Sequence, residues 1–150
     1  MAGVEVVGVF RDACLPDVLE IRSELDLDWV QLHGSEPDEW LDVLGSQVLR
    51  HVGVGAGGVD WARVSALAER CMPLIDPGAG DGRAFDWRLL RSRPEGVRFG
   101  LAGGLTPDTV GEAVRLCAPT LVDVSSGVES APGVKDPDAV RRFVEAARSA

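Results

Sequence analysis

The sequence predicts an α/β protein built on a parallel sheet. Short apolar runs alternate with longer segments of helical periodicity, giving about six strand–helix units in 150 residues. The apolar runs lack polar alternation, as strands buried on both faces do. Glycines and polar residues gather after the strands. An open doubly wound sheet and a (β/α) barrel both fit, and both bind ligands at the carboxyl ends of their strands.

The first two units begin with apolar strands. Residues 4–10, VEVVGVF, form the first predicted strand, and residues 15–25 follow with apolar residues at helical spacing. Residues 29–34, WVQLHG, form the second strand. A helix is expected from Glu36 to about Leu44, with a proline in its first turn, where proline is well tolerated.

The next two units repeat the pattern. Residues 48–54, VLRHVGV, are a predicted strand, followed by a helix from about Asp60 to Cys71 with one apolar face. Residues 72–76, MPLID, form a short strand. A glycine-rich loop separates this strand from a short helix, DWRLLRS, in which Asp86 is the expected N-cap and Trp87 a packing residue.

The last two units end the chain. Residues 97–104, VRFGLAGG, form a strand that ends in two glycines. The next helix runs to about Leu116, with Thr106 or Asp108 as its N-cap. Residues 120–127, TLVDVSSG, are the final strand. The closing helix covers Asp136 to Ala150 and turns an apolar stripe inward.

Composition narrows the function. One domain covers residues 1–150, and its formal net charge of -9 argues against a nucleic-acid partner. No apolar run approaches the length of a membrane span, and the N-terminus does not read as a signal peptide. Three cysteines, Cys14, Cys71 and Cys117, lack metal-type spacing. We therefore expect free thiols in a reducing cytoplasm, with no membrane partner.

Two loops after the last strands have the composition of a phosphate site. One contains Gly103 and Gly104, and the other contains Ser125, Ser126 and Gly127. Glycine N–H groups and serine hydroxyls suit a dianion, and barrels often bind phosphate in the loops after their last two strands. Each loop alone also reads as a tight turn. The pair together predicts a phosphate ligand.

Several other polar residues are candidates for chemistry. Asp76 ends a strand, where a carboxylate serves as a general acid or as a loop cap. Asp123 is expected inside its strand, where a carboxylate needs partners. His33 is a candidate substrate-site residue at a strand end, although a structural histidine is more common there, and His51 is expected to be structural. Arg83 reads as a surface charge whose loop could fold over a ligand.

The motifs, in order, resemble the phosphoribosylanthranilate isomerase family of tryptophan biosynthesis. They are GVF (8–10), VQLHG (30–34), PLID (73–76), GDGRAFDW (80–87), LAGGLTPDTV (101–110) and VDVSSGVES (122–130) with PGVKD (132–136). The resemblance spans nearly the whole chain and begins at the family's third strand. It implies a TIM-type (β/α) barrel with six of its eight units present and the first two missing.

The resemblance also implies a reaction. The family carries out an Amadori rearrangement of N-(5-phosphoribosyl)anthranilate without a cofactor or metal. Its general acid falls on Asp76, and its phosphate site falls on Gly103, Gly104, Ser126 and Gly127. Asp123 matches an aspartate that supports the substrate site.

The sequence departs from the family pattern in two places. The loop after the acid reads Ala79-Gly80-Asp81-Gly82 where the family has Gly-Gly-Thr-Gly. The family's base cysteine, in Lys-Ile-Cys-Gly, and its carboxylate-binding arginine lie on the two strands that this chain does not match. Neither Cys14 nor the other two cysteines replaces that base.

Three hypotheses follow. The chain is an isomerase completed by a longer N-terminus or another polypeptide, or a non-catalytic sugar-phosphate-binding or interaction module, or a related isomerase of histidine biosynthesis. The VDVSSGVE and FDW motifs favour the tryptophan enzyme. Six strands cannot close an eight-stranded barrel, so we also expect two open edges that favour self-association or a complementing N-terminal segment.

Overall fold

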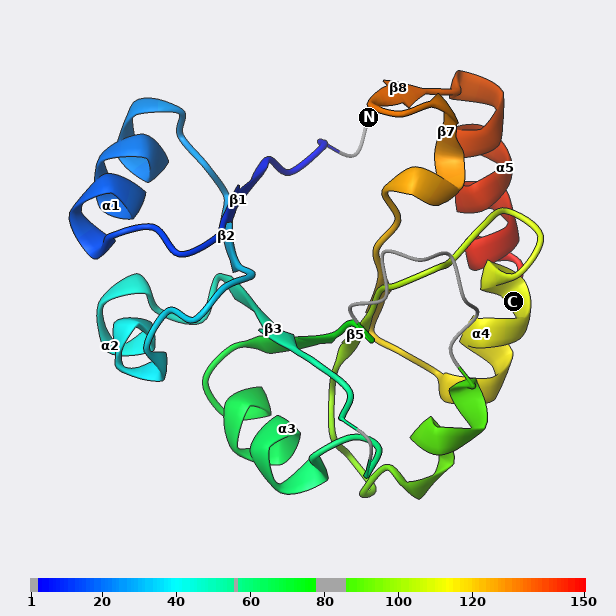
Figure 1. The fold of residues 1–150 in the computed structure, drawn as a ribbon, viewed down its shortest axis with the longest axis horizontal. Coiled ribbons are helices and arrows are strands. Elements are labelled where there is room, and N and C mark those ends of the chain that lie inside the picture. The colour runs from blue at the N-terminus through cyan, green and yellow to red at the C-terminus, as the bar shows by residue number, and fades with distance from the viewer. Residues whose placement is uncertain (1–2, 56, 78–85) are drawn as a thin grey trace.

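The computed structural model describes residues 3–55, 57–77 and 86–150. In this part of the chain, six parallel strands form one curved sheet whose spatial order is the order of the sequence. Figure 1 shows the sheet as an arc with helices along its outer side. The arc confirms the barrel-type curvature, and β1 and β6 are its two edges. The strands are β1 (Val7–Phe10), β2 (Trp29–Leu32), β3 (Val48–Val52), β4 (Met72–Ile75), β5 (Gly100–Leu101) and β6 (Leu121–Val122).

Helices cover the outer side of the sheet because each presents a narrow apolar stripe to it. Val18, Val64, Val110 and Phe143 are buried residues of four of these helices, and they pack with residues of the strands in one core. The α-helices are α1 (Leu15–Glu24), α2 (Leu41–Leu44), α3 (Trp61–Ala68), α4 (Val110–Cys117) and α5 (Pro137–Arg148), and the 3₁₀ helices are η1 (Asp38–Trp40), η2 (Trp87–Ser92) and η3 (Ser126–Val128).

The last two strands are shorter than expected. β6 ends at Val122, so Asp123 lies one residue beyond the strand rather than inside it, and only its N–H still bonds across, to the carbonyl of Leu101 at 2.9 Å. The predicted strand through Gly127 is wrong, because η3 begins at Ser126 and turns the chain away from the sheet. Because the strand ends early, the residues after Val122 form a loop.

Two predicted helix starts are also wrong. α4 begins at Val110 because the hydroxyl of Thr109 accepts the N–H of Thr106 at 3.0 Å and closes a separate turn before the helix. The helix expected from Glu36 begins as η1 at Asp38. The carbonyl of Glu36 instead accepts a hydrogen bond from Arg50, at 2.7 Å, which holds this residue outside the helix.

The C-terminal region combines a confirmed cap with an unpredicted hairpin. The carboxylate of Asp136 accepts the N–H groups of Asp138 and Ala139 at the start of α5, as its sequence position suggests. Just before it, β7 (Glu129–Ala131) and β8 (Val134–Lys135) form a small antiparallel hairpin. Its turn contains Gly133 with φ of +77°, a conformation that glycine adopts without strain.

The inner face of the arc is apolar and open. A groove of about 330 Å³ runs across it, and Val7 and Val9 on β1 are 40% and 63% exposed. Apolar side chains of a parallel sheet are normally covered on both faces. The inner face and the β1 edge are therefore the incompletely covered parts of this fold.

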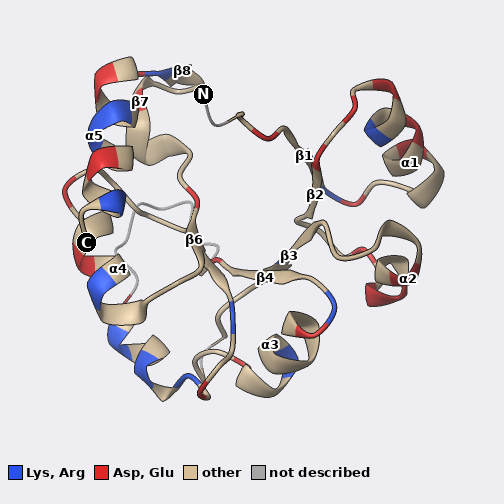
Figure 2. Ribbon diagram, turned by 180° about the vertical axis from the view of Figure 1, so that it is seen from behind, with Lys and Arg blue, Asp and Glu red and all other residues tan. Residues whose placement is uncertain are grey.

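Charge is distributed unevenly around the outside. In the ribbon of Figure 2, acidic positions prevail along α1 and α2, whereas basic positions recur along α4 and α5 between acidic ones. None of the helices in the described part of the chain is both long enough and apolar enough to cross a membrane.

Candidate active site

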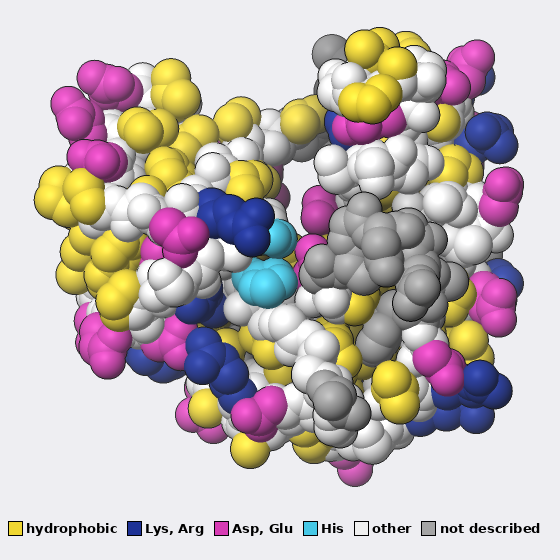
Figure 3. Space-filling model, in the orientation of Figure 1, with side chains coloured by type: hydrophobic (Ala, Val, Ile, Leu, Met, Phe, Trp, Pro, Cys, Tyr) yellow, Lys and Arg dark blue, Asp and Glu magenta, His cyan; other side chains and the backbone are white. Residues whose placement is uncertain are grey.

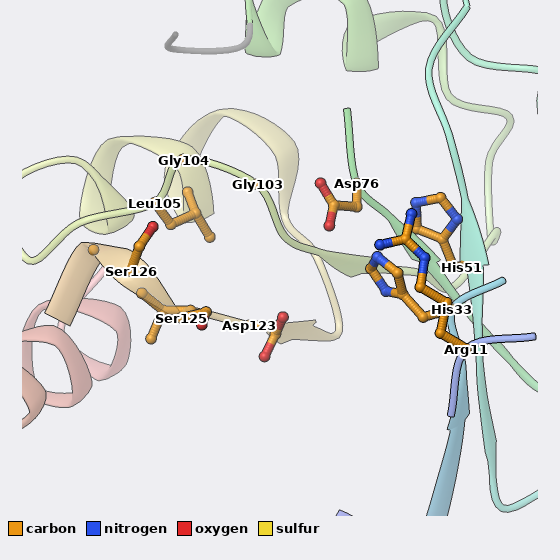
Figure 4. Close-up of a pocket in the computed structure, with 12 residues that line it drawn as sticks. Arg11, His33, His51, Asp76, Gly103, Gly104, Leu105, Asp123, Ser125 and Ser126 are labelled. Atoms are coloured by element: carbon orange, nitrogen blue, oxygen red, sulfur yellow. The ribbon is translucent and has the colours of Figure 1, made fainter. Parts of the chain in front are cut away.

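A pocket of about 350 Å³ lies where the carboxyl ends of the strands converge. Figure 3 shows two histidine side chains at the rim of this central hollow, with acidic side chains on the opposite wall. Figure 4 shows that its residues come from loops after several strands and from the end of β3. The lining residues are Arg11, His33, His51, Asp76, Gly103, Gly104, Leu105, Asp123, Val124, Ser125, Ser126 and Gly127.

One wall of the pocket is made by the loops after β5 and β6. Gly103 has φ of +83°, and a side chain there would meet Pro77 at 2.5 Å. A Cβ on Gly127 would lie 1.9 Å from the carbonyl oxygen of Leu105. Both loops therefore require glycine, and Ser126 lines the pocket beside them. This wall suits an oxyanion such as phosphate.

Lys135 supports the same wall from the β7–β8 hairpin. Its Nζ donates to the carbonyl oxygen of Ser125 at 2.8 Å and to the carboxylate of Glu129 at 2.6 Å. This bond pulls the pKa of Glu129 below its ordinary value. The bond to Ser125 fixes the loop after β6 and keeps a cation near its serines.

Two carboxylates face the space between the walls. Asp76 follows β4 directly, and its N–H donates to the carbonyl of Val52 at 3.1 Å, which sets the position of the residue. Asp123 approaches from the end of β6. Burial, followed by the nearby charge of Asp76, raises the pKa of Asp123. The pocket therefore contains a carboxyl group that holds its proton more tightly than an ordinary aspartate.

The two histidines form the wall opposite the glycine loops. The ring centroids of His33 and His51 are 4.3 Å apart, with the ring planes tilted by 35°. The Gln31 side-chain amide lies 3.3 Å from Nδ1 of His33. Burial and the charge of His33 lower the pKa of His51, which favours the neutral form of its ring.

Arg50 fixes the loop that carries His33. Its guanidinium donates to the carbonyl oxygens of Gly34 at 3.1 Å and Glu36 at 2.7 Å, and to the carboxylate of Asp38 at 2.9 Å. The Arg50 side chain is only 6% exposed. A buried guanidinium that is hydrogen-bonded to several separate acceptors restrains this loop more tightly than a surface ion pair would.

A second tie joins this loop to the loop after β1. The carboxylate of Asp12 accepts from the N–H and the hydroxyl of Ser35 at 2.9 and 2.8 Å, and these bonds lower the pKa of Asp12. Arg11, next to Asp12, lines the pocket. The tie thus fixes the place where a positive side chain enters the site.

The pocket unites nearly all the residues that the sequence singled out. It contains both carboxylates, His33 and the residues of the two glycine–serine loops. Cys14 does not line it and is an exposed residue at the N-cap of α1. Arg83 and the departure at Ala79–Gly82 lie outside the described residues.

Sequence reasoning missed Arg11 in the pocket and Lys135 beside it. His51, expected to be structural, lines the pocket, and so does Arg11. Its position directly after the first strand could have marked Arg11. Lys135 carried no signal, because a hairpin that was not predicted brings it to Ser125.

Residues 1–146 match the family model of N-(5'-phosphoribosyl)anthranilate (PRA) isomerase. The chain belongs to this family. The family's isomerase from Paracoccus denitrificans is 46% identical to it, covering 95% of this chain and 72% of the relative. The isomerase of Paramagnetospirillum magneticum is 40% identical, covering 97% and 73%.

Solved structures of PRA isomerases share the fold. The Thermotoga maritima isomerase superposes with a TM-score of 0.81 at 35% identity, covering 96% of this chain and 73% of that one. Another PRA isomerase structure, in complex with reduced 1-(o-carboxyphenylamino)-1-deoxyribulose 5-phosphate, gives a TM-score of 0.76 at 34% identity, covering 96% and 71%. The barrel predicted from the motif order is thereby confirmed.

Proposed function

We propose that the chain carries the acid and the phosphate site of an isomerase that rearranges N-(5-phosphoribosyl)anthranilate to 1-(2-carboxyphenylamino)-1-deoxyribulose 5-phosphate in tryptophan biosynthesis. The observation that carries the proposal is one pocket with an oxyanion wall on one side and Asp76 beside it. Its family relatives bear the name of this activity, and one solved relative holds the reduced form of this product.

The reaction follows from the pocket in two proton transfers. The phosphate binds to the N–H groups and hydroxyls of Gly103, Ser126 and Gly127. Asp76, as the general acid, then donates a proton to the ribose ring oxygen, the bond from C1 to that oxygen breaks, and an iminium forms. A base removes the proton from C2, giving an enolamine that becomes the ketone. Asp123, with its raised pKa, hydrogen-bonds a ribose hydroxyl.

We assign the base to a βα segment that pairs with the β1 edge. Val9, 63% exposed on that edge, and the apolar groove beside it suit a further parallel strand and its side chains. The chain spans about 73% of the length of the Paramagnetospirillum magneticum relative. The segment is either joined to this chain or supplied by a separate one.

Replacement of the acid tests the chemistry. In the completed enzyme, Asp76→Asn should lower kcat by about 10²–10⁴-fold, the range for loss of a general acid, with little change in phosphate binding. Turnover is followed by chromatographic separation of substrate and product. The matched control is Asp108→Asn, whose carboxylate is 88% exposed and outside the pocket. Retained turnover in Asp76→Asn would remove Asp76 from this role.

Co-expression tests whether a separate βα segment completes the active site. The first two βα units of the Thermotoga maritima isomerase, made as a separate polypeptide, should bind this chain and restore growth to a tryptophan-requiring strain. A homodimer without activity, seen by light scattering, would instead support pairing between two copies. Binding of inorganic phosphate without turnover in any combination would favour a non-catalytic binding module.

The compartment we propose is the cytoplasm. The three cysteines of the chain are free, and free thiols persist in a reducing compartment. Labelling of Cys14, the exposed one, with a membrane-impermeant thiol reagent in intact cells should fail and should succeed after lysis. Labelling before lysis would contradict this location.

A further inference from the structure

His33, His51 and Asp76 bring three metal-binding side chains to one point. Each offers one ligand atom, and all three atoms lie within 4.8 Å of one another. The residues come from the end of β2, from β3 and from the end of β4, so three adjacent strands hold them. Sites built on strands hold their ligands more precisely than sites on loops alone.

The donor set has a defined preference. Two imidazole nitrogens and one carboxylate oxygen suit Zn²⁺, Co²⁺ or Ni²⁺, whereas Mg²⁺ and Ca²⁺ prefer oxygen ligands alone. Tetrahedral bonds of about 2.0–2.2 Å put ligand atoms about 3.4 Å apart. The side chains would have to close by at most about 1.4 Å, which rotation about their χ angles accommodates.

Supporting contacts resemble those around metal ligands. A metal-bound imidazole commonly hydrogen-bonds through its second nitrogen, which orients the ring. The side-chain amide of Gln31 occupies that position at Nδ1 of His33. An amide can present either its NH₂ donor or its carbonyl acceptor to Nδ1, so it can hydrogen-bond the ring in either tautomer. The His51 ring hydrogen-bonds the main chain at Asp76, while its Nε2 is buried without a hydrogen-bond partner in the described part of the chain.

We propose that His33, His51 and Asp76 form a binding site for a divalent transition-metal ion of the Zn²⁺ class, and that the bound ion inhibits the isomerase reversibly. The inhibition rests on the proposed function, since Asp76 cannot both bind a metal and donate a proton.

Arg11 accounts for a metal ion that is bound reversibly rather than held permanently. Its side chain lines the same pocket, and a guanidinium repels an incoming cation. With three protein ligands and one opposing charge, the ion should be exchangeable. Loss of that charge should strengthen binding, which separates this site from an unspecific one.

Co²⁺ is the probe, because its visible absorption reports tetrahedral coordination. The experiment uses the full chain with Cys14→Ser, which removes the exposed thiol as a competing ligand. One equivalent of Co²⁺ should develop visible bands that Zn²⁺ abolishes. His51→Gln should weaken binding by more than about 100-fold, beyond the roughly 10–100-fold loss typical of a supporting residue, and Arg11→Gln should strengthen it.

The controls keep the site and the function separate. Asp108→Asn should bind Co²⁺ as the parent does, and far-ultraviolet circular dichroism checks that each variant folds. Co²⁺ affinity in His51→Gln equal to that of the parent, or visible bands that appear only when Cys14 is present, would refute the proposed metal site. This conclusion would hold whether or not the chain has isomerase activity. In the completed enzyme, Zn²⁺ should inhibit turnover at concentrations near its dissociation constant, and a chelator should restore turnover. Binding without inhibition would overturn the inhibitory role alone.

Discussion

Gly127→Ala tests how the two glycine–serine loops fit together. The added Cβ would lie 1.9 Å from the carbonyl oxygen of Leu105 and 3.2 Å from Cγ2 of Val124, whereas ordinary contact begins at 3.4 Å. The obstructing atom belongs to the backbone, so the loop after β5 or β6 must retreat by about 1.5 Å. Overpacking of this kind destabilises by about 1–3 kcal/mol.

The same displacement should damage the oxyanion wall. Misplacement of a positioning group by about 1 Å costs about 10²-fold in rate, so kcat/KM in the completed enzyme should fall about 100-fold. Urea unfolding measures the stability, and competition by inorganic phosphate measures the wall. The matched control is Gly55→Ala, where a Cβ meets nothing within 4 Å. Unchanged stability and phosphate affinity in Gly127→Ala would refute the proposed fit of the loops.

Three further predictions concern charges. Arg50→Met should destabilise the fold by about 3–5 kcal/mol, because it leaves the buried carboxylate of Glu36 without its ion-pair partner. The control Arg63→Met removes an exposed partner of Asp38 and should cost under about 1 kcal/mol. Equal losses of stability for the two variants in urea unfolding would contradict this prediction. Asp123→Asn should raise the free energy of unfolding at pH 7. Since the folded chain holds this proton more tightly than the unfolded one, wild-type stability falls as pH rises above about 4, and the gain should vanish below that pH. Lys135→Met should weaken inorganic phosphate binding by about 0.2–1 kcal/mol at low salt and less at high salt; an effect independent of salt would point to a structural role.

The sequence was sufficient for the parts of the fold that depend on local pattern. Buried parallel strands are apolar runs, and their carboxyl ends share one edge of the sheet. This geometry is why Asp76 and the Gly103–Gly104 loop could be expected near each other before the structure was known. Their meeting in one pocket also depends on the strand order, which the alternation of strands and helices leaves open and the family resemblance implies.

The parts that depend on long-range contacts could not be predicted in this way. The direction of His51 is set by the register of β3, where it lies opposite Leu74, and no local pattern shows that its ring will stack on His33. The late start of α4 reflects a competing side-chain bond at Thr109. Burial of Arg50 is equally hidden, because an arginine in a strand gives no sign of the carbonyls around it.

The agreement between strand order and chain order bears on how the protein is made. Each strand pairs with its sequence neighbours, so the pairing contacts of the sheet are between segments a few tens of residues apart at most. Pairing between neighbouring units closes only a short length of chain, which keeps the entropic cost of each pairing low. Every newly synthesised unit can dock on the one before it while the ribosome is still adding the next. The arc can therefore form progressively from β1 to β6, without waiting for the C-terminus to leave the ribosome.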